Sequence, residues 1–195
     1  MDVTPPSFHE LLEANKLIDL NAELVVEEKS IKVHRGFLTS ISPVFSAMFS
    51  QPTTEAKTGK VVITDMTYNT VKLSLDFCAG KHLSTKSPVD WVGVYTFADK
   101  YDIAAVREKL GKCFNTAKIT RETFAVYTLY AFQFSNNKLI DRCAKFLAYN
   151  PDVVLLSEFQ KIGKDVIVAV LAKASAAYCN KPSSREGSDD EYNSY

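Results

Sequence analysis

Apolar residues recur at two different spacings along the chain. Alternating or consecutive apolar residues at positions 24–33 and 61–63 predict a short hairpin and one further buried strand. Elsewhere the spacing is three and four residues, which is typical of amphipathic helices. From about residue 120 to about residue 174 only the helical spacing remains, so the sequence predicts a mixed N-terminal region followed by helices alone.

Hydroxyl side chains mark where several of these helices begin. Ser42-Pro43 and Ser87-Pro88 each combine a capping serine with a proline at the first helical position. Thr67 precedes a third apolar helical stretch and is expected to cap it. In contrast, residues 51–59 are polar and include Pro, Thr and Gly, so we expect a loop there.

A further amphipathic helix is predicted near residues 7–16, after a flexible lead that carries Pro5 and Pro6. This helix either packs on its own domain or forms a two-fold surface for self-association. An N-terminal helix behind a proline-rich lead favours exchange between two protomers, with an isologous interface. The apolar residues expected at this interface are Phe8, Leu11, Leu12 and Leu17.

The order of the elements predicts an α+β fold, with a small sheet covered by helices and an all-helical extension after it. We expect a flexible lead at residues 1–7, the α+β domain at residues 8–115 and the extension at residues 116–174. Residues 181–195 contain almost no apolar side chain, which is typical of disorder. We place the disordered tail at residues 175–195.

The charge balance argues against nucleic acid as a partner, because 23 basic residues face 23 acidic ones. No apolar run reaches the length of about 18 residues that crosses a bilayer, so we expect no membrane partner. The first residues also lack the pattern of a secretory signal.

The four cysteines are far apart and form no C-x-x-C pair. The first three fall on apolar helical faces, which favours buried free thiols over a disulfide or a zinc site. Free thiols indicate a reducing compartment, the cytoplasm or the nucleus. The cysteines are Cys78, Cys113, Cys143 and Cys179.

No pattern of residues predicts catalysis. His34 could be a metal ligand or a general base, but no second histidine or carboxylate cluster stands near it, and a structural histidine is the favoured interpretation. Asp99 and Lys100 are adjacent on a helix and so do not face each other. No glycine-rich phosphate loop and no nucleophile signature occur. We therefore expect no enzyme activity, no catalytic residue, no cofactor and no metal.

Four segments stand in the order and spacing that is typical of BTB (POZ) domains. They are Val33-His34-Arg35, the octapeptide from Ser42 to Phe49, Val62-Ile63-Thr64-Asp65 and Ala98-Asp99-Lys100-Tyr101. Over residues 8–115 the chain resembles this family, and within it the speckle-type, MATH-BTB group. The helices at 116–174 resemble the 3-box/BACK extension of cullin-binding members. No MATH domain is visible in the 195 residues, so substrate recognition would come from a longer protein or from a partner, or the chain would act as a competitor.

The resemblance implies a homodimer that serves as a substrate adaptor for a cullin-3 ubiquitin ligase, with an unknown substrate protein. Its cullin motif, apolar–any–Glu, falls on Thr53-Thr54-Glu55. Thr53 replaces an apolar anchor worth roughly 1.5–3 kcal/mol, which predicts weaker cullin binding. Phe45, on the neighbouring helix, is either a half-exposed aromatic anchor for the cullin or a core residue.

Two other functions stay open. The chain could be a dimerising scaffold or regulator that does not bind a cullin. A transcriptional corepressor is the third possibility. Repressor members of the family carry an Asp at the position of Asn21, facing a basic residue at the position of Arg35. The missing charge and the absence of zinc fingers make this function the least favoured.

Overall fold

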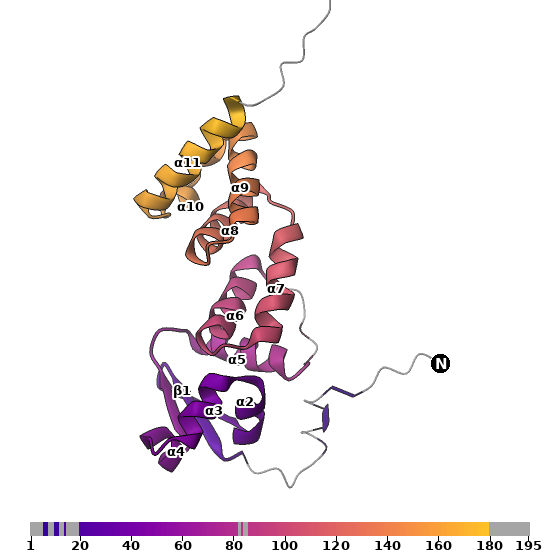
Figure 1. The fold of residues 1–195 in the computed structure, drawn as a ribbon, viewed down its shortest axis with the longest axis vertical. Coiled ribbons are helices and arrows are strands. Elements are labelled where there is room, and N and C mark those ends of the chain that lie inside the picture. The colour runs from indigo at the N-terminus through magenta and orange to yellow at the C-terminus, as the bar shows by residue number, and fades with distance from the viewer. Residues whose placement is uncertain are drawn as a thin grey trace, which may run out of the picture. The chain divides into compact units, whose positions relative to one another are not determined.

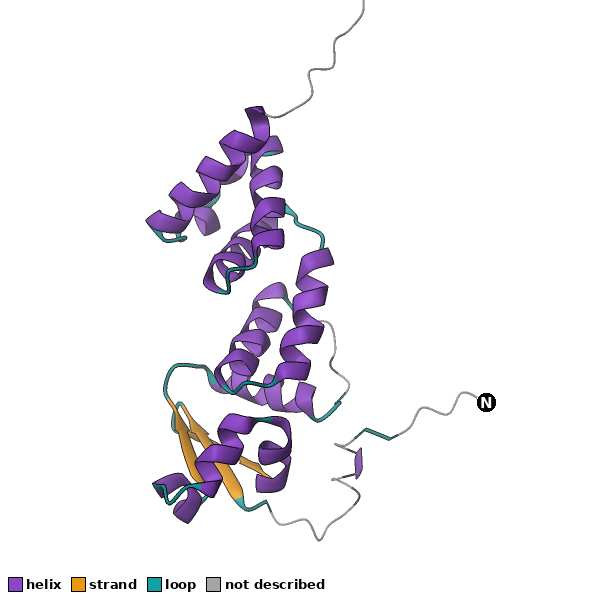
Figure 2. Cartoon of the chain, viewed as in Figure 1, coloured by secondary structure: helices purple, strands orange, loops and turns teal. Residues whose placement is uncertain are grey.

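The computed structural model describes residues 6–7, 10–11, 14, 20–81, 83 and 86–179. The chain divides into two compact units, residues 1–118 and residues 119–195 (Figure 1). The first unit contains the sheet, and the described part of the second is helical (Figure 2). This arrangement confirms the predicted α+β fold with a helical extension.

The sheet of the first unit has three strands, β1 (Ala22–Val26), β2 (Lys29–Val33) and β3 (Lys60–Ile63), in the order β2-β1-β3. β1 and β2 form the predicted antiparallel hairpin, whose two-residue turn places Glu27 and Glu28 at φ 48° and 63°. β3 pairs with β1 in parallel, which requires a long crossover connection. Three short helices supply that connection, namely α2 (Arg35–Ile41), α3 (Pro43–Ser50) and α4 (Thr54–Thr58).

Three longer helices complete the described part of this unit, α5 (Tyr68–Cys78), α6 (Pro88–Lys100) and α7 (Ala104–Thr116). The predicted caps are confirmed, because the Ser42 hydroxyl accepts the Phe45 N–H at 3.0 Å and the Thr67 hydroxyl accepts the Thr70 N–H at 3.2 Å. Ser87 caps α6. The prediction of a loop at residues 51–59 is wrong in part, since the segment contains α4.

The second unit contains α8 (Arg121–Gln133), α9 (Asn137–Tyr149), the 3₁₀ helix η1 (Pro151–Leu155), α10 (Ser157–Gln160) and α11 (Lys164–Cys179). Its core includes Phe124 of α8, which stacks on Phe146 of α9 and on Phe159 of α10. Because α11 continues to Cys179, residues 175–179 are helical and the predicted disordered tail begins too early. The rest of that tail lies outside the described residues.

The environments of the four thiols differ. Cys143 is buried and Cys78 is half-buried, and burial raises the pKa of each thiol to about 11. Both therefore stay protonated and weakly reactive at neutral pH. Cys113 and Cys179 are exposed, so the predicted burial of Cys113 is wrong. Helical spacing grouped Cys113 with Phe114, but only Phe114 of the two is buried.

No helix among the described residues is long and apolar enough to span a bilayer. Within the same residues, histidine, cysteine and acidic side chains form no cluster of three or more that could hold a metal ion.

Candidate functional site

The junction between β2 and α2 is organised by His34 and Asn21. His34 caps α2, because its Nδ1 accepts the Phe37 N–H at 3.3 Å. This contact supports the structural interpretation of the histidine. The Asn21 Oδ1 accepts the Arg35 N–H at 2.9 Å, so the asparagine holds the backbone of the residue that begins α2.

The Arg35 side chain extends from this junction to α3 and α4. Its guanidinium carbon lies 4.8 Å from the centre of the Phe49 ring on α3. Its Nη2 donates to the carbonyl of Ala56 on α4 at 3.3 Å. Arg35 thus connects three segments that are separate in the sequence.

Helix α4 is fixed at its beginning by Thr53. The Thr53 hydroxyl donates to the carbonyl of Met48 at 2.8 Å and accepts the Ala56 N–H at 3.1 Å. The threonine therefore caps α4 and joins it to α3, roles that an apolar side chain cannot perform. Thr53, at which the sequence was expected to depart from the apolar–any–Glu motif, thus has a structural function in this chain.

At its other end α4 is stopped by Gly59. Gly59 has φ 72°, the left-handed conformation that favours glycine, and its N–H donates to the carbonyl of Glu55 at 2.8 Å. Its own carbonyl accepts the Glu23 N–H at 2.8 Å, which ties the end of α4 to β1. A Cβ at this position would lie 2.8 Å from the carbonyl oxygen of Asn21.

Replacing Gly59 by alanine is expected to lower the free energy of unfolding by about 1–2 kcal/mol, because a Cβ is strained in the left-handed region. The close contact with the Asn21 carbonyl adds to that loss. Urea denaturation followed by circular dichroism measures the change. Gly163→Ala is the control, since an added Cβ there meets no heavy atom within 4 Å. Equal losses for the two variants would contradict the proposed strain.

Glu55 lies in the first turn of α4 and is half-buried. Its carboxylate makes no hydrogen bond or ion pair with any residue that the structure describes. Thr54 beside it is exposed. The first turn of α4 therefore presents an acceptor that is available to another molecule.

Phe45 does not belong to this exposed surface. Its side chain is 0% exposed, and its ring stacks on Tyr101 of the α6 C-terminus, with the centroids 4.2 Å apart. The centres of the Phe97 and Phe49 rings lie 6.4 and 6.5 Å from the centre of the Phe45 ring. The prediction of a half-exposed anchor is therefore wrong, and the core interpretation is correct. The hydroxyl of Ser42 donates to the Tyr101 carbonyl at 2.5 Å, which holds this side of α3 against α6.

Asp99 and Lys100 engage different partners. Lys100 Nζ lies 2.5 Å from Asp65 Oδ1, and Arg107 lies 3.6 Å from Asp99. The hydrogen bond from Lys100 lowers the pKa of Asp65. These pairs are exposed to solvent, where an ion pair contributes little to stability. Adjacent on α6, Asp99 and Lys100 thus face different partners, as the sequence predicted.

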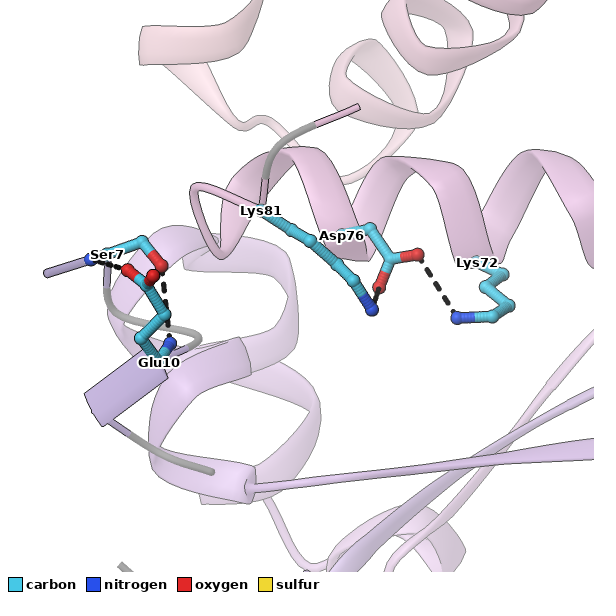
Figure 3. A network of polar contacts seen from close by, with 5 residues as sticks. All are labelled: Ser7, Glu10, Lys72, Asp76 and Lys81. Atoms are coloured by element: carbon cyan, nitrogen blue, oxygen red, sulfur yellow. Dashed lines mark hydrogen bonds and ion pairs between the residues drawn. The ribbon is translucent and has the colours of Figure 1, made fainter. Parts of the chain in front are cut away.

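Ser7 and Glu10 bond to each other near the N-terminus, as Figure 3 shows. The Ser7 hydroxyl accepts the Glu10 N–H at 3.2 Å, and the Glu10 carboxylate accepts the Ser7 N–H at 2.6 Å, which is a capping box. The same view shows Asp76 of α5 between Lys72 and Lys81. The Asp76 carboxylate oxygens lie 3.1 Å from Lys72 Nζ and 3.9 Å from Lys81 Nζ.

Of the four residues predicted for the dimer interface, the structure describes Leu11, which is 54% exposed. The other three residues predicted for the dimer interface lie outside the described residues, namely Phe8, Leu12 and Leu17.

Comparison with known proteins shows to which proteins the chain is similar. The sequence matches the family model of the BTB/POZ domain over residues 8–118, which is more than half of the chain. It is 34% identical over 88 residues to the BTB and MATH domain-containing protein 42 of Caenorhabditis elegans, a match that covers 43% of this chain. The chain spans about a fifth of that relative, 21% of its length. The solved BTB domain of human gigaxonin has a TM-score of 0.42 and 18% identity, and covers 56% of this chain and 93% of that one.

Proposed function

Because the chain belongs to the BTB/POZ domain family, we propose that it is a homodimeric adaptor that brings a cullin-3-type ubiquitin ligase to a substrate protein. BTB domains are protein-interaction modules that generally mediate dimerisation and bind partners, and the family is generally non-enzymatic. Under this proposal the chemistry belongs to the ligase. The chain contributes proximity, because a substrate held beside the ligase reacts as part of one complex.

The observation that carries the proposal is the position of Glu55. The glutamate follows the family pattern of the cullin motif, and its carboxylate lies in a short capped helix directly before β3. With no bonding partner among the described residues, it can accept hydrogen bonds from a cullin. A charge-assisted bond of this kind is about twice as strong as a neutral one.

The remaining parts of the proposal rest on the domain organisation. Residues 116–174 act as a 3-box/BACK-like extension that adds contact area for the cullin. The substrate is a protein, and its recognition lies outside the surfaces described above. The four cysteines form no disulfide, which favours a reducing compartment, the cytoplasm or the nucleus.

A titration of the full chain against the N-terminal half of cullin-3 tests the proposal. Wild type is expected to bind with a dissociation constant below about 100 μM, and Glu55→Ala is expected to raise that constant about tenfold. Isothermal titration calorimetry measures both values. Glu108→Ala is the matched control, because it removes an exposed carboxylate from α7, where Glu108 pairs only with Lys112 among the described residues. Binding weaker than this limit, or equal affinities for wild type and Glu55→Ala, would overturn the adaptor function.

One observation favours the second candidate, a dimeric scaffold that engages no cullin. The hydroxyl of Thr53 is used inside the chain, so the apolar anchor of the family motif has no replacement at this position. In the titration above, the scaffold predicts no measurable heat of binding while the chain stays dimeric.

A further inference from the structure

The Arg35 guanidinium carries a charge that no carboxylate of the described residues neutralises. No ion pair of Arg35 occurs in that part of the chain, and its Nε is buried without a hydrogen-bond partner. An unpaired buried donor is unfavourable by itself. The favourable contacts of the Arg35 side chain are with the Phe49 ring and the Ala56 carbonyl. These two contacts therefore indicate the role of the guanidinium.

Helix α4 needs support from outside. None of its residues is buried, and five residues are far too few for a stable isolated helix. Its last carbonyls have no partner within the helix, as in every helix end. Ala56 carries one of them, and Arg35 Nη2 donates to it. A cation at this end also interacts favourably with the helix dipole.

The geometry around Arg35 depends on two further residues. Asn21 Oδ1 holds the Arg35 backbone at 2.9 Å. Gly59 lies next to the guanidinium, since a Cβ there would be in van der Waals contact with Arg35 Nη2, at 3.4 Å. Phe49 supplies a flat ring beside the guanidinium, a surface that suits a planar guanidinium better than an ammonium.

We propose that Arg35 is a positioning residue for partner binding. It caps the end of α4 from the β2–α2 junction and thereby holds Glu55 in the orientation that a partner recognises. A helix that is ordered before binding loses less conformational entropy when the complex forms. This preorganisation offsets part of the affinity lost with the apolar anchor at Thr53. The identity of the partner rests on the proposed cullin-binding function, and the ordering of α4 does not.

Hydrogen exchange tests the ordering without any partner. The reporters are the Lys57 and Gly59 amides, which donate to the Thr53 and Glu55 carbonyls. In Arg35→Met both are expected to exchange about tenfold faster, while the sheet amides of β1 keep their rates. Lys57→Met is the matched control, since it removes an exposed cation from the same helix. Unchanged rates at α4, or equal acceleration in the sheet, would overturn the positioning role.

A double-mutant cycle on cullin binding tests whether Arg35 acts through Glu55. Arg35→Met alone is expected to weaken binding about tenfold. In the Glu55→Ala background it is expected to add no more than about twofold, because the carboxylate that it positions is gone. If the losses of binding free energy in the two single variants add up in the double variant, Arg35 does not act on the partner through Glu55. Light scattering must show the same dimer mass for all four proteins.

The two proposals fail in different ways. If wild type does not bind cullin-3, the adaptor function is overturned, and hydrogen exchange alone decides the role of Arg35. If wild type binds and Arg35→Met keeps both the affinity and the protection of α4, the positioning role is overturned and the adaptor function stands. If Arg35→Met does not fold, the same measurements are made on Arg35→Lys. Lysine keeps the positive charge but lacks the planar, forked guanidinium.

Discussion

Replacing Phe45 by alanine is expected to lower the free energy of unfolding by about 3–5 kcal/mol, the largest loss of any substitution considered. The side chain is fully buried, and its ring contacts Tyr101, Phe97 and Phe49. Alanine would leave a cavity between α3 and α6 that the surrounding aromatic rings cannot fill without moving. Urea denaturation followed by tryptophan fluorescence measures the loss, because Trp91 lies on α6 of the same unit.

The control for this variant is Val89→Ala, which shortens a side chain that is 62% exposed at the start of α6. It is expected to change the free energy of unfolding by less than about 0.5 kcal/mol. If Phe45→Ala lost less than about 1 kcal/mol and yet weakened cullin binding, Phe45 would be a contact residue after all.

Replacing Leu11 by glutamate is expected to raise the dissociation constant of the homodimer at least about 30-fold, which corresponds to about 2 kcal/mol. Leu11 is 54% exposed in the single chain, so the partner's surface is what would cover it. Glutamate is tolerated in the first turn of a helix, and the capping box of Ser7 and Glu10 stays intact. The loss therefore reports on the interface and not on the helix.

Sedimentation equilibrium over a range of concentrations measures this constant. Leu155→Glu is the control, because it places the same charge at a leucine that is 76% exposed in the second unit. A dimer of unchanged stability in Leu11→Glu, or a similar loss in Leu155→Glu, would show that the N-terminal helix does not form the interface.

Elements that depend on neighbouring residues were predictable from the sequence. The helix beginnings at Ser42, Thr67 and Ser87 follow from contacts within three residues of each cap. α4 was missed although Thr53 and Gly59 cap its two ends locally, because its other supports are distant in the sequence. Arg35 lies 21 residues before Ala56, and the Gly59 carbonyl bonds to Glu23. Nothing in the polar sequence of residues 51–59 signals these contacts.

The candidate site was predictable only in part. The positions of Thr53 and Glu55 came from a resemblance to a family, while the capping role of Thr53 required coordinates. The sequence placed Phe45 on a short helix beside the candidate motif, but it could not tell a buried aromatic side chain from one that contacts a partner. Phe45 is buried against Tyr101, which lies at the end of α6 and far away in the sequence. A pattern in one helix carries no information about such a distant partner.

The central claim is that two copies of the chain associate and that each presents the first turn of α4 to a cullin. Light scattering coupled to size-exclusion chromatography tests this claim most directly, with the chain at tens of micromolar and an excess of the cullin-3 N-terminal half. We expect the mass of two chains without the cullin fragment, and the mass of two chains with two cullin fragments in the mixture. With Glu55→Ala, we expect the mixture to show the mass of two chains only. A single-chain mass, or a dimer whose mass does not change when the cullin is added, would contradict the central claim.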